Sequence, residues 1–207
     1  MTMKTILIAV CGVVAITGVA LAAPLTFDFK DPKGVNNAVF KLDAPLEAIN
    51  GSASGITGTV MFDPANPAAT KGKILVAADS LTVPNAMMKE HLHGGQWMDV
   101  ATHKEISFEA KELKNVKTAG DKTTADAVGT LTIKGVAKEV TAPISLTYLK
   151  DKLGMRVNKP DLKGDLLVVR ANFSIKRSDF GINPKAPEDK VSDTIDLTLS
   201  IAGAAAK

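Results

Sequence analysis

Cysteine is almost absent from this chain. The sequence of 207 residues contains one cysteine, Cys11, and it lies in an apolar segment close to the N-terminus. A disulfide framework is therefore excluded, and the fold must be stabilised by an ordinary hydrophobic core, for which the chain is long enough. A thiolate metal site of the zinc-finger type is excluded for the same reason.

Aromatic residues and one-sided charge are scarce as well. The chain has seven Phe, one Trp and one Tyr, and its 25 Lys and Arg residues are scattered among 22 Asp and Glu residues. A nucleic-acid interface normally needs clustered basic residues interleaved with aromatic rings. We therefore expect no nucleic-acid partner, and the shortage of rings argues against a carbohydrate-stacking surface.

A single long hydrophobic run is present, and it lies at the N-terminus. Lys4 precedes an uncharged apolar stretch over residues 6–19, which the small residues Ala20-Leu21-Ala22 follow. This order is typical of a secretory signal peptide with an A-x-A cleavage site. It predicts export, cleavage near Ala22 and one mature domain over residues 23–207. An uncleaved membrane anchor is the alternative, although the run is short for a spanning helix.

Short alternating runs of apolar and polar residues, separated by Gly, Pro, Asn or Asp, fill the rest of the chain. Such alternation is typical of strands with one buried face, and no stretch keeps a long helical period. The pattern predicts an all-β fold of eight antiparallel strands. We expect them at residues 35–43, 55–62, 73–81, 105–113, 123–134, 136–148, 166–176 and 194–202.

The stretch from Pro84 to Val100 breaks this pattern, because its apolar residues are interspersed with charged ones. We expect a short helical or irregular segment that covers one end of the fold as a lid. Trp97 follows the pair Gly94-Gly95, which can act as a hinge. The ring is either a moving part of the lid or a fixed hydrophobic plug.

Eight antiparallel strands can close into a barrel that is either filled by side chains or open to one small ligand. Both alternatives stay open from the pattern alone. Many of the side chains expected to point inward are small or aliphatic, so an open interior would bind an apolar chain by shape. The expected inward residues are Val60, Phe62, Leu75, Ala77, Phe108, Ala110, Leu131, Ile133, Ile144, Leu146, Phe173, Ile175, Leu197 and Leu199.

The segment Ser174-Ile-Lys-Arg-Ser-Asp-Phe-Gly-Ile182 ends an alternating strand abruptly. Gly181 permits a positive φ, and we expect Phe180 to fold back over an apolar opening. Arg177 and Asp179 are the charged pair at this corner. The arginine either meets a ligand head group at the barrel mouth, or the pair is structural, bridging to each other or capping backbone groups.

Four further blocks accompany this corner in a fixed order along the chain. They are Met88-Lys-Glu-His-Leu92, Trp97-Met-Asp-Val100, Glu105-Ile-Ser-Phe108 and Gly129-Thr-Leu-Thr-Ile-Lys-Gly-Val136. In combination these blocks resemble the YceI-like family of bacterial periplasmic proteins, over the chain from about Val35 to Ile201. The resemblance implies an antiparallel, lipocalin-like β-barrel with a polyisoprenoid or a similar long-chain amphiphile in its lumen. It implies no known catalysis.

For this chain the resemblance implies a periplasmic carrier of a polyisoprenoid or prenyl quinone-like lipid, with no cofactor and no catalytic residue. The residues expected to bind the ligand are Val60, Phe62, Leu75, Phe108, Leu131, Ile133, Leu146, Phe173, Ile175, Leu197 and Leu199. The residues expected at the lid and mouth are Met88, His91, Leu92, Trp97, Arg177, Asp179 and Phe180. Transient contact with a membrane and a homodimer are open possibilities.

Two segments depart from the family pattern. Where the family often has an aspartate followed shortly by His-Ser, this chain reads Asp28-Phe-Lys-Asp-Pro-Lys-Gly-Val-Asn-Asn37. A frequent Tyr-Pro pair of the family is replaced by His103-Lys104. The role of the family's histidine therefore does not carry over to this chain.

Three other kinds of function are weaker alternatives. His91 and His93 lie on one face only in a strand, and the lid segment does not read as a strand, so we expect no metal site. No serine lies in a G-x-S-x-G elbow, which makes a hydrolase a remote alternative. A barrel packed solid with side chains would instead act through its surface, as an interaction or scaffold module.

Overall fold

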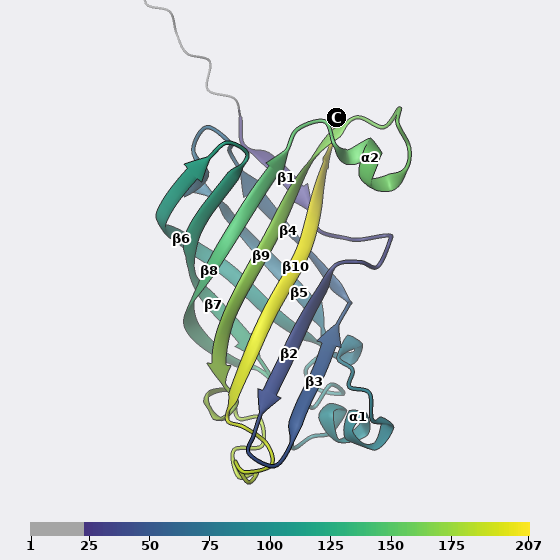
Figure 1. Cartoon of the computed structure of the whole chain (residues 1–207), viewed down its shortest axis with the longest axis vertical. Helices are drawn as coiled ribbons and strands as arrows, with labels where there is room; N and C mark the ends of the chain where they lie inside the picture. Colours follow the sequence, from purple (N-terminus) through teal and green to yellow (C-terminus); the bar gives the residue numbers. More distant parts are fainter. Residues whose placement is uncertain (1–22) are drawn as a thin grey trace, which may run out of the picture.

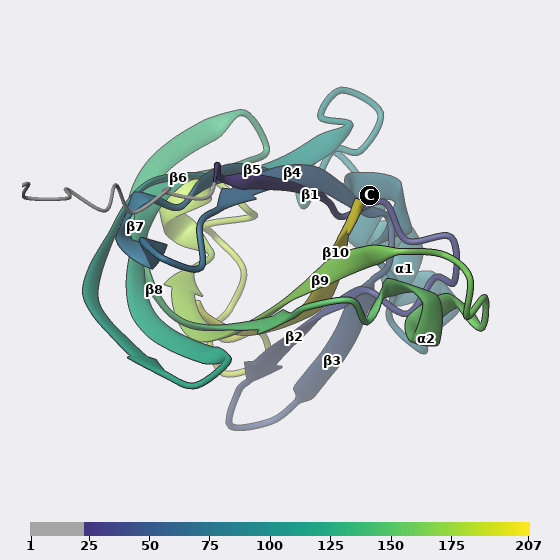
Figure 2. The same cartoon turned by 90° about the horizontal axis from the view of Figure 1, so that it is seen from above.

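The computed structural model describes residues 23–207, and the predicted signal peptide lies outside the described residues. The described chain forms one antiparallel sheet that closes into a barrel (Figures 1 and 2). The closed ring has eight strands in the order β1, β4, β5, β6, β7, β8, β9 and β10, and β1 pairs back with β10. The prediction of an eight-stranded antiparallel barrel is confirmed.

The strands are β1 Leu25–Asp28, β2 Asn37–Asp43, β3 Ala48–Ala53, β4 Ile56–Phe62, β5 Lys71–Ala77, β6 Glu105–Ala119, β7 Lys122–Ile133, β8 Val136–Leu149, β9 Gly164–Lys176 and β10 Thr194–Ala206. The α-helices are α1 Ala86–His93 and α2 Leu153–Val157, and the 3₁₀ helices are η1 Pro67–Ala69, η2 Ala78–Ser80 and η3 Ser178–Phe180. None of the helices in residues 23–207 is long and apolar enough to cross a membrane.

All eight predicted strands are present, and two further strands, β1 and β3, were missed. Strand β1 has only four residues, which is too short for an alternating pattern to stand out. Strand β3 contains Gly51 and two polar residues, so its sequence Ala-Ile-Asn-Gly-Ser-Ala looks like a turn. The strand predicted over residues 73–81 ends at Ala77, where η2 begins.

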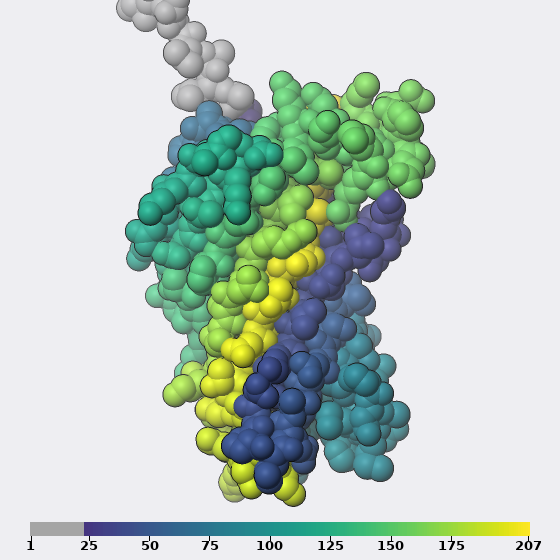
Figure 3. Space-filling model, in the orientation of Figure 1, coloured from purple at the N-terminus to yellow at the C-terminus, as the bar shows by residue number. Residues whose placement is uncertain are grey.

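Strand β10 has two different neighbours along one edge. Its first half pairs with β2, and Ala204 near its end pairs with Asp28 of β1. β10 therefore runs between β9 and β2 on the face seen in Figure 3. The hairpin of β2 and β3 continues the barrel wall beyond the closed ring, at the end where α1 lies (Figure 1).

Between β1 and β2 there is a seam, where neither strand pairs with β10. The side chain of Asn36 fills this seam and makes the hydrogen bonds to β10 that the backbone of a strand would make. Asn36 is fully buried, and its amide nitrogen donates to the carbonyl of Ala202 at 3.2 Å, while its Oδ1 accepts from the Ala202 N–H at 2.9 Å. Asp31 holds the preceding turn, because its Oδ2 accepts from the amides of Val35 and Asn36 at 2.6 Å each. The segment that departs from the family pattern thus forms this seam.

One end of the barrel is closed by aromatic rings, and we call it the closed end. Phe27, Phe62 and Tyr148 pack there with ring centroids 5.9–6.4 Å apart. Behind them the buried carboxylate of Asp165 accepts from the Tyr148 hydroxyl and from the Lys207 ammonium, each at 2.8 Å. The C-terminal residue therefore ties the end of β10 to the wall.

The opposite end, the lid end, carries α1 and the loop between β9 and β10. Helix α1 begins after Asn85, whose side-chain oxygen accepts from the Met88 N–H at 2.9 Å and so caps the helix. The chain before the helix is fixed to β3, because Ser52 and Thr82 exchange backbone hydrogen bonds of 2.9 and 2.8 Å. The predicted lid helix is present and lies where the barrel opens.

Candidate functional site: the barrel lumen

The lumen contains a chamber of about 200 Å³ in the middle of the barrel, which we call the inner chamber. Among residues 23–207, no charged side chain lines it, and the only polar lining residues are Thr70 and Thr198. The chamber exists because small residues occupy many wall positions. These are Ala38, Ala53, Gly72, Ala110, Ala127, Ala142 and Ala171. The interior is therefore open, which argues against the filled-barrel alternative.

Two phenylalanine rings lie flat against the wall instead of filling the lumen. The Phe108 ring covers Gly129, and the Phe40 ring covers Gly51, so that a Cβ atom on either glycine would overlap the ring. Aromatic rings placed over strand glycines protect the backbone and are a known device in β-sheets. Here the arrangement also leaves the centre of the barrel free.

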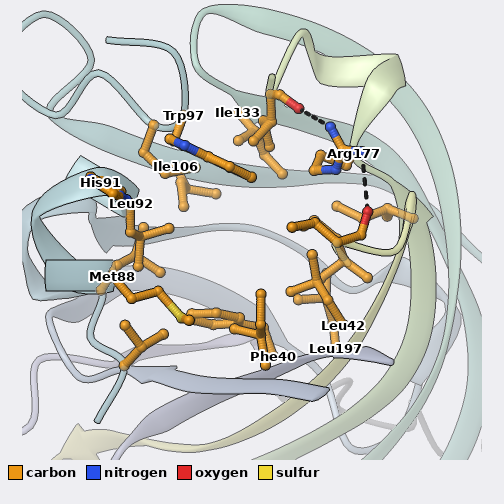
Figure 4. A pocket seen from close by; sticks show the side chains of 18 of the residues that line it. Phe40, Leu42, Met88, His91, Leu92, Trp97, Ile106, Ile133, Arg177 and Leu197 are labelled. Carbon is orange, nitrogen blue, oxygen red and sulfur yellow. Dashed lines mark hydrogen bonds between the residues drawn. The ribbon is translucent and has the colours of Figure 1, made fainter. Parts of the chain in front are cut away.

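A second chamber of about 280 Å³ lies at the lid end, and we call it the lid chamber. Met88 and Leu92 of α1 and Trp97 from the following loop form one side of it, and Phe40 and Leu42 of β2 lie opposite (Figure 4). Unlike the inner chamber, it has ionisable side chains in its wall. These are Glu47 on the β2–β3 turn, His91 on α1 and Arg177 at the end of β9.

Arg177 is buried and is bound by backbone carbonyls. Its guanidinium donates to the carbonyl oxygens of Ile182, Asn183, Val191 and Ser192, and its centre lies 5.9 Å from the Trp97 ring. Within residues 23–207 it forms no ion pair at 4.0 Å or less. The side chain thus ties together both ends of the loop between β9 and β10.

The pairing of Arg177 with Asp179 is wrong as a prediction, because Asp179 points to solvent and lines neither chamber. Asp193 is the acid that faces this corner instead. Burial opposes its ionisation, but hydrogen bonds from the hydroxyl and amide of Ser178 and the charge of Arg177 outweigh that effect and lower its pKa. Of the structural alternatives, capping of backbone groups is the one that the geometry shows.

Most of the predicted wall residues line a chamber. The inner chamber includes Val60, Phe108, Leu131, Leu146, Phe173 and Leu199, the lid chamber includes Ile175, and Ile133 and Leu197 line both. Phe62 also points inward, but it packs in the aromatic plug of the closed end. Their role in binding a ligand stays a prediction.

Leu75 is wrong as a wall residue, and so is Ala77. In β5 the chambers are lined by Gly72, Ile74 and Val76, so Leu75 lies on the outer face. The run Ile-Leu-Val-Ala is apolar on both faces, and alternation alone cannot set its direction. The signal that resolves it is Lys73, whose charged side chain must face solvent and places Leu75 beside it.

At the lid end, Met88, His91, Leu92, Trp97 and Arg177 all line the lid chamber, as predicted for the mouth. Phe180 is buried in the core next to that chamber and does not reach its surface.

Several lining residues were not identified from the sequence, and those of β2 are an example. Phe40 and Leu42 line the lid chamber, and Ala38 and Phe40 line the inner one. The alternation of apolar and polar residues predicts a strand here, and the choice of its apolar face as the inner face would identify these residues. Leu81 lines both chambers from an irregular loop, where no periodic signal exists.

The histidines lie apart from other side chains that commonly bind metals. In the part of the chain that the structure describes, no group of three His, Cys, Asp or Glu residues could hold an ion. A ring nitrogen of His93 lies 2.7 Å from the Leu81 carbonyl oxygen, so this side chain links α1 to the preceding loop. His91 is exposed at the edge of the lid chamber.

The fold and lumen define a class: antiparallel, lipocalin-like barrels with an apolar interior that opens under a lid. Within that class, a family model described as a YceI-like domain matches residues 12–203, and the chain belongs to the YceI-like family. UPF0312 proteins of Pseudomonas paraeruginosa and Yersinia pestis are each 32% identical, over 153 and 157 residues. The alignments cover 74% and 76% of this chain and 72% and 74% of those proteins.

Solved structures share the fold at lower identity. BcnA of Burkholderia cenocepacia matches with a TM-score of 0.64 and 21% identity, over 81% of this chain and 95% of that one. A polyisoprenoid binding domain from Saccharophagus degradans matches with a TM-score of 0.62 and 10% identity, over 88% and 99%. The Campylobacter jejuni YCEI protein gives 0.59 and 23%, over 76% and 84%.

Proposed function

We propose that the protein binds a polyisoprenoid or a similar long-chain amphiphile in its lumen and carries it through the periplasm. The observation that supports this most strongly is the inner chamber, which is enclosed by the barrel and has no charged side chain in its wall. Such a wall recognises the length and width of a chain and offers few directed hydrogen bonds. The Saccharophagus degradans neighbour, a polyisoprenoid binding domain, has the same fold.

The hydrophobic effect is large enough to drive this binding. Each buried methylene contributes about 0.8 kcal/mol, so a five-carbon prenyl unit is worth roughly 3–4 kcal/mol before the costs of association and ordering. A few prenyl units therefore suffice for tight binding.

The two chambers also suit the two parts of an amphiphile. In this proposal the chain enters the inner chamber and the head group stays in the lid chamber, since the exposed polar residues Glu47 and His91 line only the latter. A head group left among the aliphatic residues of the inner chamber would lose its hydrogen bonds to water without replacement.

A thermal-shift experiment on delipidated protein tests the proposal, with a ubiquinone of several prenyl units as the probe. At a probe concentration about 100 times Kd, binding adds roughly 2.7 kcal/mol of stability, which for a domain of this size raises Tm by several degrees. We expect that rise for the wild type. A wild-type protein that shows neither a shift nor binding contradicts the proposal.

A matched pair of variants tests whether the lumen is the place of binding. Ala127→Leu adds a side chain to the wall of the inner chamber, whereas Ala137→Leu adds the same atoms at an exposed position in β8. We expect the first variant to lose most of the Tm rise with the probe and the second to keep it. Equal responses would place binding elsewhere.

The periplasmic location rests on the N-terminal segment, which lies outside the described residues. Cell fractionation of the full-length protein, followed by mass measurement of the exported form, tests it. We expect periplasmic protein that begins at Ala23. Transient membrane contact and a homodimer stay predictions as well.

A further inference from the structure

The inner chamber and the lid chamber meet at a ring of five side chains. Phe40, Leu81, Ile106, Ile133 and Leu197 line both chambers, and they come from β2, the loop after η2, β6, β7 and β10. Figure 4 shows four of them around the lid chamber, namely Phe40, Ile106, Ile133 and Leu197.

The ring lies at one level along the barrel. In β10 the inward residues run from Ile195 in the lid chamber, through Leu197 in both, to Leu199 in the inner chamber. Phe40 faces Leu197 across the β2–β10 ladder, so β2 reaches both chambers at the same level. The ring is therefore a constriction between two chambers stacked along the barrel axis.

Neither chamber alone is large for a ligand site. Small-molecule sites typically measure about 300–1,000 Å³, and the chambers measure about 280 and about 200 Å³. Joined through the ring, they reach that range. A chain that enters the inner chamber from the lid chamber must therefore pass between the five side chains.

Phe40 is the only aromatic residue among these five side chains, and its phenyl group packs on a glycine. Its cross-strand neighbour in β3 is Gly51, and the Phe40 ring occupies the space that a Cβ atom of Gly51 would need. The carbonyl oxygen of Thr82 lies 2.6 Å from the same Cβ position, so the backbone also leaves no room for a side chain there. The Phe40 phenyl group therefore lies against the barrel wall over Gly51. A larger residue at position 51 would displace it into the passage between the two chambers.

We propose that Phe40 is the specificity-determining residue at this constriction, which admits long apolar chains to the inner chamber and leaves short ligands in the lid chamber. The inference rests on the proposed function. A chain that enters the inner chamber by this route must contact the phenyl group of Phe40, which stays packed on Gly51. Chain length is therefore sensed at Phe40, before the inner chamber is reached.

The test compares two ubiquinone probes, one with a single prenyl unit and one with several, binding to delipidated protein. Trp97 is the only tryptophan of the chain and lines the lid chamber, so its quenching by the quinone reports association in a stopped-flow instrument. We expect Phe40→Ala to speed association of the long probe about tenfold, which corresponds to roughly 1.4 kcal/mol off the barrier. The short probe should change less than about twofold on the same scale.

Two further variants keep the test decisive. Phe40→Trp narrows the passage and should slow the long probe alone, and Phe40→Leu replaces the alanine variant if that one does not fold. Phe29→Ala is the matched control, because Phe29 also packs on a glycine, Gly203, but lines neither chamber. It should leave the association rate of the long probe unchanged.

Equal effects of Phe40→Ala on both probes, or the same acceleration by Phe29→Ala, overturn the inference while the proposed function stands. A wild-type protein that binds neither probe overturns the proposed function, and this inference with it.

Discussion

The two ends of the barrel are built in different ways. At the closed end, Phe27, Phe62 and Tyr148 fill the interior, and the ion pair of Asp165 with Lys207 fixes the last strand. At the lid end, a buried arginine holds a loop by its carbonyls, and a chamber of about 280 Å³ remains beneath the helix. The closed end is organised for stability, whereas the lid end keeps space at the expense of packing.

This difference teaches where a binding barrel can leave volume unfilled. Tight packing and hydrogen-bonded polar groups stabilise the closed end. Along the rest of the lumen, small residues and phenylalanine rings that pack on glycines leave space unfilled. Substitutions at the closed end should therefore change the free energy of unfolding, and substitutions along the lumen should change ligand binding. The following predictions go from the largest expected effect to the smallest.

Removal of Asp165 should damage the closed end most. Asp165→Ala leaves the Tyr148 hydroxyl, the Lys207 ammonium and the Asp151 N–H without their common acceptor. Lys207 is partly exposed and keeps Asp151 as an acceptor, so the loss comes mainly from the other two donors. Each donor left without an acceptor costs about 1–3 kcal/mol in the free energy of unfolding, which urea denaturation measures. Asp179→Ala is the control at an exposed acid and should stay within about 0.5 kcal/mol of the wild type. Equal losses in the two variants would contradict the comparison.

Arg177→Lys should destabilise the lid end without affecting the lumen. An ammonium cannot reach the four carbonyls that the planar guanidinium bridges. We expect a loss of about 2 kcal/mol in the free energy of unfolding, measured by urea denaturation. Affinity for the long ubiquinone probe, measured where the variant is folded, should be unchanged. A strong loss of affinity would instead show that Arg177 binds the head group.

Acid should weaken the seam and the closed end. Burial opposes the ionisation of Asp31 and Asp165, but backbone hydrogen bonds, and the cations Arg156 and Lys207 respectively, outweigh it and lower the pKa of each. A lowered folded-state pKa gives stability that is present above the unfolded value, about 3.9, and is lost as pH falls through the folded value. Urea midpoints should thus fall steeply below about pH 4, and less steeply in Asp165→Asn. Identical slopes would contradict this.

Alkaline titration of the Tyr148 hydroxyl should show whether the hydrogen bonds of the closed end are formed. Burial, together with the hydrogen bond to Asp165 and its charge, raises the pKa of Tyr148 to about 12. Tyr148 is the only tyrosine of the chain, so the absorbance of tyrosinate follows it directly. We expect a midpoint near 12 in folded protein and near 10 in urea. Stability should fall between these values, because the folded pKa is the higher one. A folded midpoint near 10 would mean that the hydroxyl is free.

Strong periodic signals made much of the fold predictable. In β10, the inward faces of Ile195, Leu197, Leu199 and Ile201 follow from strict alternation, and the lid helix follows from the break in that pattern. The seam was not predictable, because the side-chain amide of Asn36, and not the backbone of a strand, hydrogen-bonds to β10 there. A contact of this kind produces no alternating pattern in the sequence. Position in space alone reveals such a contact.

The candidate site was predictable in outline and not in detail. Inward residues such as Phe108 and Phe173 follow from alternation, yet Leu75 does not, since both faces of β5 are apolar. The division into two chambers depends on Phe40 resting on Gly51, a contact between neighbouring strands. The sequence predicts which wall residues are polar or apolar, whereas the volumes of the two chambers follow only from the folded barrel.

The central claim is that the lumen holds a chain lipid. Native mass spectrometry of the mature protein, purified from a bacterium that makes isoprenoids, followed by organic extraction, tests it most directly. The account predicts a stoichiometric added mass that fragments as a prenyl chain or similar long-chain amphiphile, and its loss in Ala127→Leu but not in Ala137→Leu. Bare wild-type protein that also fails to rebind added prenyl lipids would contradict it.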